Sequence, residues 1–439
     1  MFDILFCNAD IITMCDENPV IRGGYVGING KHITYVGNER PEGKAKRCID
    51  CCHKVLMPGL VNTHTHTAMS LLRGYADDYA LNEWLFDKVF PVEARLTEQA
   101  IEAGVTLGFA EMLRTGTTSI SDMYYFQPKA AQIALDCGIR ASFCNGIIAF
   151  DADAFNPESD RGVTETKILA ERFHNAGDGR IKADASIHAE YTSSPKIWHF
   201  VNDMADKYGL NMQIHLSETK NEHENCIEKY GKTPTAILAE NGVFERKAIA
   251  AHCVWLSEDD MDILASKGVS CAHNPISNLK LASGIANVRK MLDHGMNVAL
   301  GTDGCCSNNT HDLFEEIRFA SLLAKGTSYD PTALCAYDTL KLATVNGALA
   351  QGRENEIGRI KCGLEADIIL LDLSSPITRP YYDPISAVVY STSGRDVYMT
   401  MIQGKILYEN GEYKTIDIEK AIANADSLAT KITNGEELC

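Results

Sequence analysis

The sequence lacks the marks of a secreted or membrane-spanning chain. Its first ten residues carry two acids, Asp3 and Asp10, and no basic cluster. No stretch reaches the roughly 18 consecutive apolar residues that a membrane-spanning helix needs. We therefore expect neither a secretory leader nor a transmembrane segment.

Basic residues are also scarce. The chain has 41 Lys and Arg residues against 59 Asp and Glu residues, which gives a formal net charge of −18. A surface with this balance repels phosphate backbones and anionic membranes. We expect a small-molecule partner, and neither nucleic acid nor a membrane. The sequence leaves open whether the chain forms a homo-oligomer.

The fifteen cysteines do not have the spacing of a disulfide framework, which favours a reducing cytoplasm. One CxxC, Cys48 to Cys51, has no second CxxC to complete a zinc site. It leads into the strand-like run Lys54–Met57, whereas a redox CxxC normally opens a helix. Buried or half-buried free thiols are therefore favoured over half a zinc site or a redox pair.

Apolar, strand-like runs alternate with helical stretches through most of the 439 residues, without an internal sequence repeat. About eight such runs occur, the number that closes a (β/α)8 TIM barrel. They centre on Leu60–Asn62, Thr117–Ile120, Arg140–Phe143, Ala183–Ile187, Met212–Ile214, Ile249–Ala251, Val269–Cys271 and Val298–Leu300. Helices are expected from Thr97, as N-cap, to Gly116, from Glu165 to about residue 175, and over Lys196–Tyr208.

Both ends of the chain have short strands and turns rich in Asn, Asp and Gly. The Asn29-Gly30 pair indicates a hairpin, and Gln403-Gly404 indicates a second turn. Strands are expected at Ile4–Phe6, Ile11–Thr13, Gly24–Ile28, His32–Val36, Asp367–Leu371, Ala387–Tyr390, Val397–Ile402 and Ile406–Tyr408. We predict an α/β protein in which residues 1–56 and 357–439 form one small β-sandwich domain beside a barrel of residues 57–356.

Chemically active side chains follow nearly every predicted barrel strand. His64 and His66 alternate on one strand and share a face, so both can bind one ion. His215 and Asp303 follow two later strands, and together the four residues suit Zn²⁺ or another divalent metal. Taken singly, each has a structural alternative, such as a hydrogen-bonded core histidine or a turn aspartate. Further polar strand-end residues are Asp122, Asn145, His188, His252, His273 and Asn274.

Two long connections, residues 67–96 and 146–162, lie where a barrel forms its active site. The first carries Trp84 and Glu93, and the second ends near Arg161. For Trp84, packing of the loop and contact with a ligand are equally supported by the sequence.

At this point the chain resembles a known family, the amidohydrolase superfamily, and within it the deaminases of 5′-methylthioadenosine and S-adenosylhomocysteine. The resemblance covers nearly the whole chain, including the β domain at the termini. Its most specific motifs are Met57–His66, Trp84-Leu85, Pro91–Ala94, His215–Thr219, His273–Gly284 and Gly301–Gly304.

The resemblance implies one metal site, formed by His64, His66, His215 and Asp303. Asp303 would bind the metal and also take a proton from the attacking water. The implied cofactor is one divalent ion, Zn²⁺ first, with Fe²⁺ or Mn²⁺ as alternatives. Binuclear members have a carboxylated lysine at the end of the fourth strand, where this chain has His188, so a mononuclear site is expected.

The same resemblance implies the substrate contacts. Glu218 would serve the purine ring as an acid, and His252 would polarise the attacking water or stabilise the developing alkoxide. Glu93 would accept the ribose hydroxyls, and His188 would line the cavity. Trp84 would pack near the sugar and the 5′ substituent.

The expected reaction is hydrolytic deamination of an adenosine-type thioether nucleoside, with adenosine itself as a further candidate. A metal lowers the pKa of water to about 7, and Glu218 can protonate the ring nitrogen that the attack requires. Arg161 is the candidate to bind the homocysteine carboxylate, with a surface ion pair as the alternative. Deamination or hydrolysis of guanine, a pterin or an s-triazine stays open, as does a scaffold without metal.

Overall fold

The computed structural model describes residues 1–80, 83–151 and 153–435, which form two compact units. One unit comprises Met1–Asn62, Ala110–Ser119 and Asp312–Ile416. The other comprises Thr63–Phe109, Ile120–His311 and the chain from Asp417 onward. The domain boundaries predicted after residues 56 and 356 stay a prediction.

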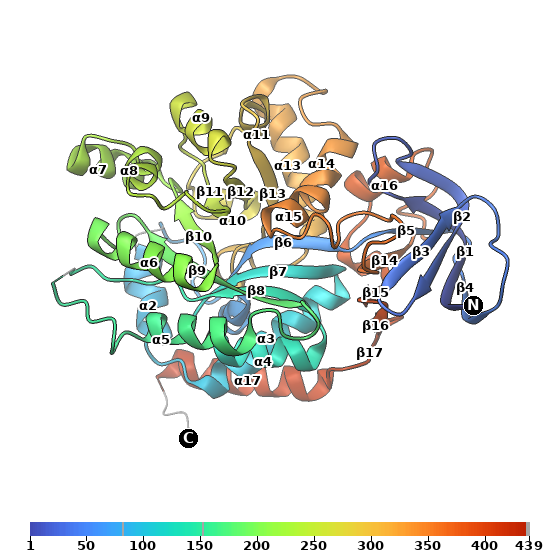
Figure 1. The fold of residues 1–439 in the computed structure, drawn as a ribbon, viewed down its shortest axis with the longest axis horizontal. Coiled ribbons are helices and arrows are strands. Elements are labelled where there is room, and N and C mark those ends of the chain that lie inside the picture. The colour runs from blue at the N-terminus through green and yellow to red at the C-terminus, as the bar shows by residue number, and fades with distance from the viewer. Residues whose placement is uncertain (81–82, 152, 436–439) are drawn as a thin grey trace. The chain divides into compact units, whose positions relative to one another are not determined.

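An eight-stranded sheet follows the chain order from β6 to β13, as the labels in Figure 1 trace. Its strands are β6 (Leu60–Thr65), β7 (Thr117–Met123), β8 (Arg140–Cys144), β9 (Ile181–Ala189), β10 (Asn211–Leu216), β11 (Ala248–His252), β12 (Ser270–His273) and β13 (Asn297–Leu300). Neighbouring strands from β8 to β13 pair in parallel. All eight predicted strands are present, which confirms the TIM-barrel prediction.

Hydrogen bonds at residue His64 join the last strand to the first. The backbone N–H groups of Thr302 and Asp303 donate to the His64 carbonyl oxygen at 3.1 and 3.0 Å. The Thr63 hydroxyl donates to the carbonyl oxygen of Leu300 at 2.8 Å. The chain therefore returns to its first strand immediately after β13, and this places Asp303 beside His64.

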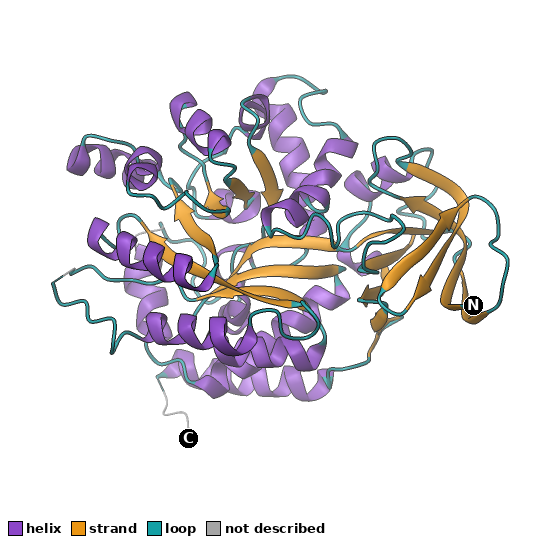
Figure 2. Ribbon diagram, viewed as in Figure 1, coloured by secondary structure: helices purple, strands orange, loops and turns teal. Residues whose placement is uncertain are grey.

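Helices separate the strands in the order that the sequence indicates (Figure 2). These segments are η1 (Thr67–Leu72), η2 (Trp84–Val89), α2 (Phe90–Glu93), α3 (Glu98–Arg114), α4 (Gln127–Cys137), α5 (Arg161–Ile168), η3 (Leu169–Phe173), α6 (Pro195–Tyr208), α7 (Lys220–Tyr230), α8 (Pro234–Glu240), α9 (Glu258–Ser266), α10 (Pro275–Lys280), α11 (Val288–Asp293) and, after β13, α12 (Cys305–Asn308). One further helix, α17 (Ile418–Asn434), follows the last strand of the chain. The Thr97 hydroxyl accepts a hydrogen bond from the Ala100 N–H, so the predicted cap of α3 is confirmed. None of the described helices combines the length and the apolar character that a membrane crossing needs.

Strands from both ends of the chain form a second, nine-stranded sheet, as predicted. They are β1 (Phe2–Ile12), β2 (Val20–Asn29), β3 (His32–Gly37), β4 (Ala45–Asp50), β5 (Lys54–Pro58), β14 (Ile368–Asp372), β15 (Val397–Ile402), β16 (Lys405–Glu409) and β17 (Glu412–Tyr413). The two ends meet where β14 pairs antiparallel with β5, opposing Leu370 to Leu56. Side chains of β1, β2, β5, β14 and β15 form a shared apolar core.

One predicted strand is wrong. Ala387–Tyr390 lies in a helix, α16 (Pro384–Tyr390), and not in the sheet. The Asp383 side chain accepts a hydrogen bond from the Ile385 N–H, and Pro384 occupies the first helical position. This cap and proline are helix-start signals, which a run of four apolar residues does not override. The remaining helical segments are α13 (Leu313–Ser328), α14 (Ala336–Leu342), α15 (Val345–Ala350) and η4 (Gly394–Asp396).

Two other expectations can be compared with the structure. The helix expected from Glu165 begins earlier, at Arg161, because Asp160 caps it by accepting the Val163 N–H. The CxxC begins at Cys48 within β4 and ends at Cys51, directly after that strand. Both thiols are free, as expected, and that of Cys51 is buried, but that of Cys48 is exposed and not buried or half-buried as predicted.

Gly404 provides a test of the turn between β15 and β16. Its φ is +71°, and a Cβ there would lie 2.1 Å from the carbonyl oxygen of Gly30. Gly411 also has a positive φ, +90°, but nothing lies within 4 Å of its Cβ position. Gly411→Ala is expected to lower the free energy of unfolding by about 1 kcal/mol, because alanine does not favour this backbone conformation. Gly404→Ala should cost about 1–3 kcal/mol more, because a main-chain atom must move.

Thermal unfolding of both variants measures this difference. The apparent melting temperature should fall clearly further for Gly404→Ala than for Gly411→Ala. Equal falls would mean that the close approach to Gly30 does not limit the turn.

Candidate active site

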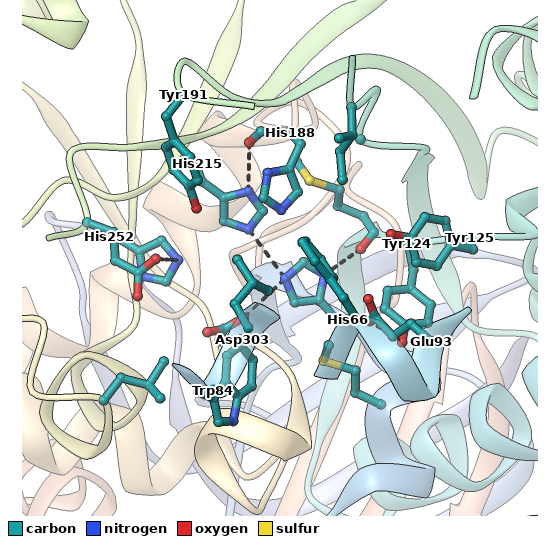
Figure 3. A pocket seen from close by; sticks show the side chains of 18 residues that line it. His66, Trp84, Glu93, Tyr124, Tyr125, His188, Tyr191, His215, His252 and Asp303 are labelled. Carbon is teal, nitrogen blue, oxygen red and sulfur yellow. Dashed lines mark hydrogen bonds and ion pairs between the residues drawn. The ribbon is translucent and has the colours of Figure 1, made fainter. Parts of the chain in front are cut away.

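Four side chains from three strand ends meet in one buried place. His64 lies on β6 and His66 follows directly after that strand, while His215 lies on β10 and Asp303 follows β13. The Asp303 Oδ1 lies 3.2 Å from the His66 Nε2 and 3.6 Å from the His64 Nε2. The His215 Nε2 lies 3.3 Å from the His66 Nε2. Figure 3 shows His66, His215 and Asp303 pointing toward one another. The structure thus brings together all four predicted metal ligands.

Backbone carbonyl groups orient two of these imidazoles. The His215 Nδ1 lies 2.8 Å from the carbonyl oxygen of His188. The His66 Nδ1 makes the corresponding hydrogen bond to the carbonyl oxygen of Met123. An imidazole that donates its Nδ1 proton in this way presents Nε2 as a ligand atom, which is the usual arrangement around protein-bound metals.

Two serine hydroxyls orient the carboxylate. Ser277 and Ser307 donate to the Asp303 Oδ2 at 2.6 and 2.9 Å. The other oxygen, Oδ1, is then the one that faces the imidazoles. Ser277 lies within the motif His273–Gly284, but the sequence did not predict that it binds Asp303.

The spacing and charge of the four groups fit a metal ion. A tetrahedral ion with ligands at about 2.0–2.2 Å separates them by about 3.3–3.6 Å, close to the distances found here. Burial lowers the pKa of His64 to about 4 and holds that of His215 well below its usual value, so both imidazoles are neutral, as metal binding requires. Burial opposes ionisation of Asp303, but its hydrogen bonds to His64 and His66 hold its pKa well below the usual value.

His66 differs from the other two histidines. Burial would lower its pKa, but the neighbouring Asp303 carboxylate raises it to about 9. A proton therefore competes with a cation for the His66 Nε2, and metal affinity should weaken as the pH falls.

Glu218 and His252 form a second polar pair next to these ligands. The Glu218 Oε2 lies 3.8 Å from the His252 Nε2, and the Ser283 hydroxyl donates to Glu218 Oε1 at 3.0 Å. The His252 Nδ1 lies 2.8 Å from the Asn278 side-chain oxygen. Burial raises the pKa of Glu218, so this carboxyl can hold and deliver a proton.

A cavity beside the four ligands is lined by most of the predicted substrate contacts. Trp84, on η2, is buried in its wall, and His188, near the end of β9, also lines it. Glu93, at the end of α2, accepts a hydrogen bond from the Tyr124 hydroxyl at 2.6 Å. In Figure 3, His252 and Glu93 lie on opposite sides of His66. Because Glu218 lies next to His252, a ligand in this cavity can meet the Glu218 carboxyl at one end and the Glu93 carboxyl at the other.

Arg161 lies at the start of α5 and lines an adjoining cavity that shares Glu93 and Tyr125 with the first. Its guanidinium stacks on the ring of Tyr125, with 4.6 Å between the guanidinium carbon and the ring centre. Its Nε lies 3.7 Å from Glu165 Oε1, and the side chain is half exposed. The ion pair considered as an alternative is thus present, and Arg161 also borders the cavity.

Tyr124 and Tyr125 are site residues that the sequence reasoning missed. They follow the end of β7 directly, and their position after a barrel strand was the available signal. Asp122, on the same strand, does not line the cavity and instead accepts the backbone N–H of Thr67 at 2.8 Å.

Comparison with known proteins identifies the class. A model of the amidohydrolase family matches residues 55–407, and the chain belongs to that family. Among curated relatives, it is 43% identical over 436 residues to the 5-methylthioadenosine/S-adenosylhomocysteine deaminase of Acetivibrio thermocellus, covering 98% of this chain and 99% of the relative. It is 42% identical over 435 residues to the 5′-deoxyadenosine deaminase of Methanosarcina barkeri, with the same coverage.

Solved structures agree with this assignment. The crystal structure of an adenosine deaminase from Xanthomonas campestris with bound zinc is 34% identical, covers 99% of both chains and superposes with a TM-score of 0.94. The atrazine chlorohydrolase of Arthrobacter aurescens, complexed with zinc, reaches a TM-score of 0.89 at 23% identity over 97% of this chain and all of its own. The second likeness shows a shared fold alone.

Asp303→Asn tests the metal centre. The substitution keeps the volume and the serine hydrogen bonds but removes the negative charge opposite the imidazoles. We expect the fold to persist and metal affinity to fall at least about 10-fold. Elemental analysis after reconstitution and a circular dichroism melt measure the two properties. Asp262→Asn, on a largely exposed aspartate, is the matched control. Normal metal content in Asp303→Asn would contradict the ligand assignment.

Proposed function

We propose that the chain is a metal-dependent hydrolytic deaminase of adenosine-type nucleosides, with 5′-methylthioadenosine and S-adenosylhomocysteine as first candidates and adenosine as a further one. It would release ammonia and the inosine-type product. The observation that carries this proposal is the presence of two carboxyl groups in the lining of one cavity, the half-buried Glu93 and the buried Glu218. Glu218 lies 3.8 Å from His252, and Figure 3 shows His252 and Glu93 on opposite sides of His66. The relatives named as nucleoside deaminases support the same reaction.

The cofactor in this proposal is one divalent ion held by His64, His66, His215 and Asp303, with Zn²⁺ first and Fe²⁺ or Mn²⁺ as alternatives. The zinc in the Xanthomonas structure supports this choice. Such an ion supplies Lewis-acid chemistry and lowers the pKa of water toward neutrality. His188 at the end of β9, where binuclear members have a lysine, supports a single ion.

The chain's own residues provide the proton transfers. Glu218, protonated in its buried position, donates to the ring nitrogen of the adenine, which makes the carbon that bears the amine electrophilic. Asp303 takes a proton from the attacking water and passes it to the departing amine, so that the carbon–nitrogen bond breaks and ammonia leaves. The remaining hydroxyl proton returns to Glu218 as the carbonyl of the product forms. His252 stabilises the negative charge that develops on the attacking oxygen.

The remaining contacts position the substrate. Glu93 accepts the ribose hydroxyls, while Trp84 packs against the sugar and His188 lines the cavity. Arg161 binds the carboxylate of a homocysteine substituent, with the stacked ring of Tyr125 fixing the guanidinium. A cytoplasmic location stays a prediction; it suits the exposed free thiol of Cys48, because a reducing compartment keeps such thiols reduced.

A substrate panel tests the proposed reaction. Metal-loaded protein is incubated with 5′-methylthioadenosine, S-adenosylhomocysteine, adenosine, guanine, a pterin and an aminated triazine. Ammonia release and an ultraviolet change toward inosine are expected with the adenine nucleosides. Ammonia from guanine, the pterin or the triazine alone would support the heterocycle alternative. Bound metal without any turnover would contradict both.

Glu93→Gln tests the sugar contact. Loss of a charged acceptor for the ribose hydroxyls should raise KM for nucleosides by about 10- to 100-fold. Glu83→Gln, on an exposed glutamate of the same connection, is the matched control and should leave KM unchanged. Unaltered turnover of nucleosides by Glu93→Gln would exclude ribose binding and favour a free-base substrate.

A further inference from the structure

Glu222 is a buried carboxyl, 7% exposed, in the first turn of α7. The Thr219 hydroxyl accepts the Glu222 N–H at 3.2 Å, and the Glu222 Oε2 accepts the Thr219 N–H at 3.4 Å. This reciprocal pair is a capping box, an ordinary way to begin a helix. Taken alone, the capping box would give Glu222 a structural role only.

The same carboxylate makes two closer contacts that a capping box does not require. Its Oε1 accepts the N–H of Ser217 at 2.9 Å, and its Oε2 accepts the N–H of Glu218 at 2.7 Å. Both are shorter than the bond to Thr219. Glu222 is therefore bound more closely to the segment that carries Glu218 than to its own helix cap.

That segment has a strained backbone. Ser217 has a φ of +47°, a conformation that non-glycine residues rarely adopt. Its carbonyl oxygen accepts the N–H groups of Val254 and Trp255 at 3.1 and 3.0 Å, so the turn is bound on both sides. The turn directs Glu218 toward Ser283 and His252.

We propose that Glu222 is a positioning residue for Glu218, fixing the strained turn so that the Glu218 carboxyl stands where it can deliver its proton. This inference rests on the proposed function, in which Glu218 is the acid. Glu222 does not line the cavity, so it acts through the backbone of Ser217 and Glu218 and not by touching the substrate.

The chain contains a matched control for this role. Asp260, 1% exposed, occupies the same position in the capping box of α9, after β11. It accepts the N–H of Ser257 at 2.9 Å and is capped by the Ser257 hydroxyl at 3.1 Å. Its carboxylate also accepts the hydroxyl groups of Ser257 and Thr233, and the backbone N–H that it accepts belongs to the cap residue. Asp260 therefore measures what a buried capping carboxyl contributes to stability.

The test compares Glu222→Gln with Asp260→Asn in the full-length, metal-loaded protein. Each amide keeps its volume but replaces one acceptor oxygen with an NH₂ group, which cannot accept a backbone N–H. Both variants should melt earlier than the wild type and keep the wild-type metal content. Only Glu222→Gln should lose kcat, by at least about 10-fold, with KM changed by less than about 3-fold.

Three results would overturn the inference. Wild-type kcat in Glu222→Gln would show that the turn holds without the carboxylate. Equal losses of kcat in both variants would show a general effect of lower stability, and loss of metal with kcat would show a role in the metal site. If the wild-type protein releases no ammonia from any nucleoside, the proposed function fails and the inference with it. An active wild type with an unchanged Glu222→Gln overturns the inference alone.

Discussion

Two backbone N–H groups, those of Thr302 and Asp303, donate to the carbonyl oxygen of His64, and the rest of the site depends on this pair of hydrogen bonds. They join the last barrel strand to the first, although the residues are far apart in sequence. They also bring the Asp303 carboxylate against the imidazoles of His64 and His66. The contacts that join the last strand to the first therefore also place the carboxylate beside the imidazoles of the predicted metal site.

Strain at the strand ends is the second constraint. Ser217, His252 and Asp303 are non-glycine residues with φ values of +47°, +73° and +59°. Such conformations cost about 1–3 kcal/mol each and persist where surrounding contacts determine them. The surrounding contacts are polar: Glu222 on Ser217, Asn278 on the ring of His252, and two serines on the carboxylate of Asp303. A layer of buried hydrogen bonds thus supports the residues that face the cavity.

The sequence predicted the parts of the site that depend on strand periodicity. His64 and His66 had to share a face if their segment was a strand, and His215 and Asp303 had to meet them if the strands formed a parallel barrel. Two of the polar residues, His252 and His273, end their strands as expected, whereas Asp303 follows the end of β13 by three residues. The family resemblance, and not periodicity, pointed to Glu93 and Trp84.

Other features were predicted wrongly or missed, because a local capping signal decides them or because they depend on contacts between distant segments. The four apolar residues Ala387–Tyr390 fit a strand and a helix equally well, and it is the Asp383-Pro384 start before them that selects the helix. The hydrogen bond between Tyr124 and Glu93 joins two segments whose proximity appears only in the folded chain. In the sequence, Glu222 has the position of an ordinary helix-capping residue, and its hydrogen bond with the Ser217 N–H depends on the fold of the turn before the helix.

The central claim is that a single metal ion is held by His64, His66, His215 and Asp303. The most direct test is an anomalous difference map, recorded at the zinc absorption edge from crystals of zinc-reconstituted protein. The account predicts one peak at about 2.0–2.2 Å from all four ligand atoms. A peak bounded by other residues, or a second peak of equal height beside the first, would contradict it.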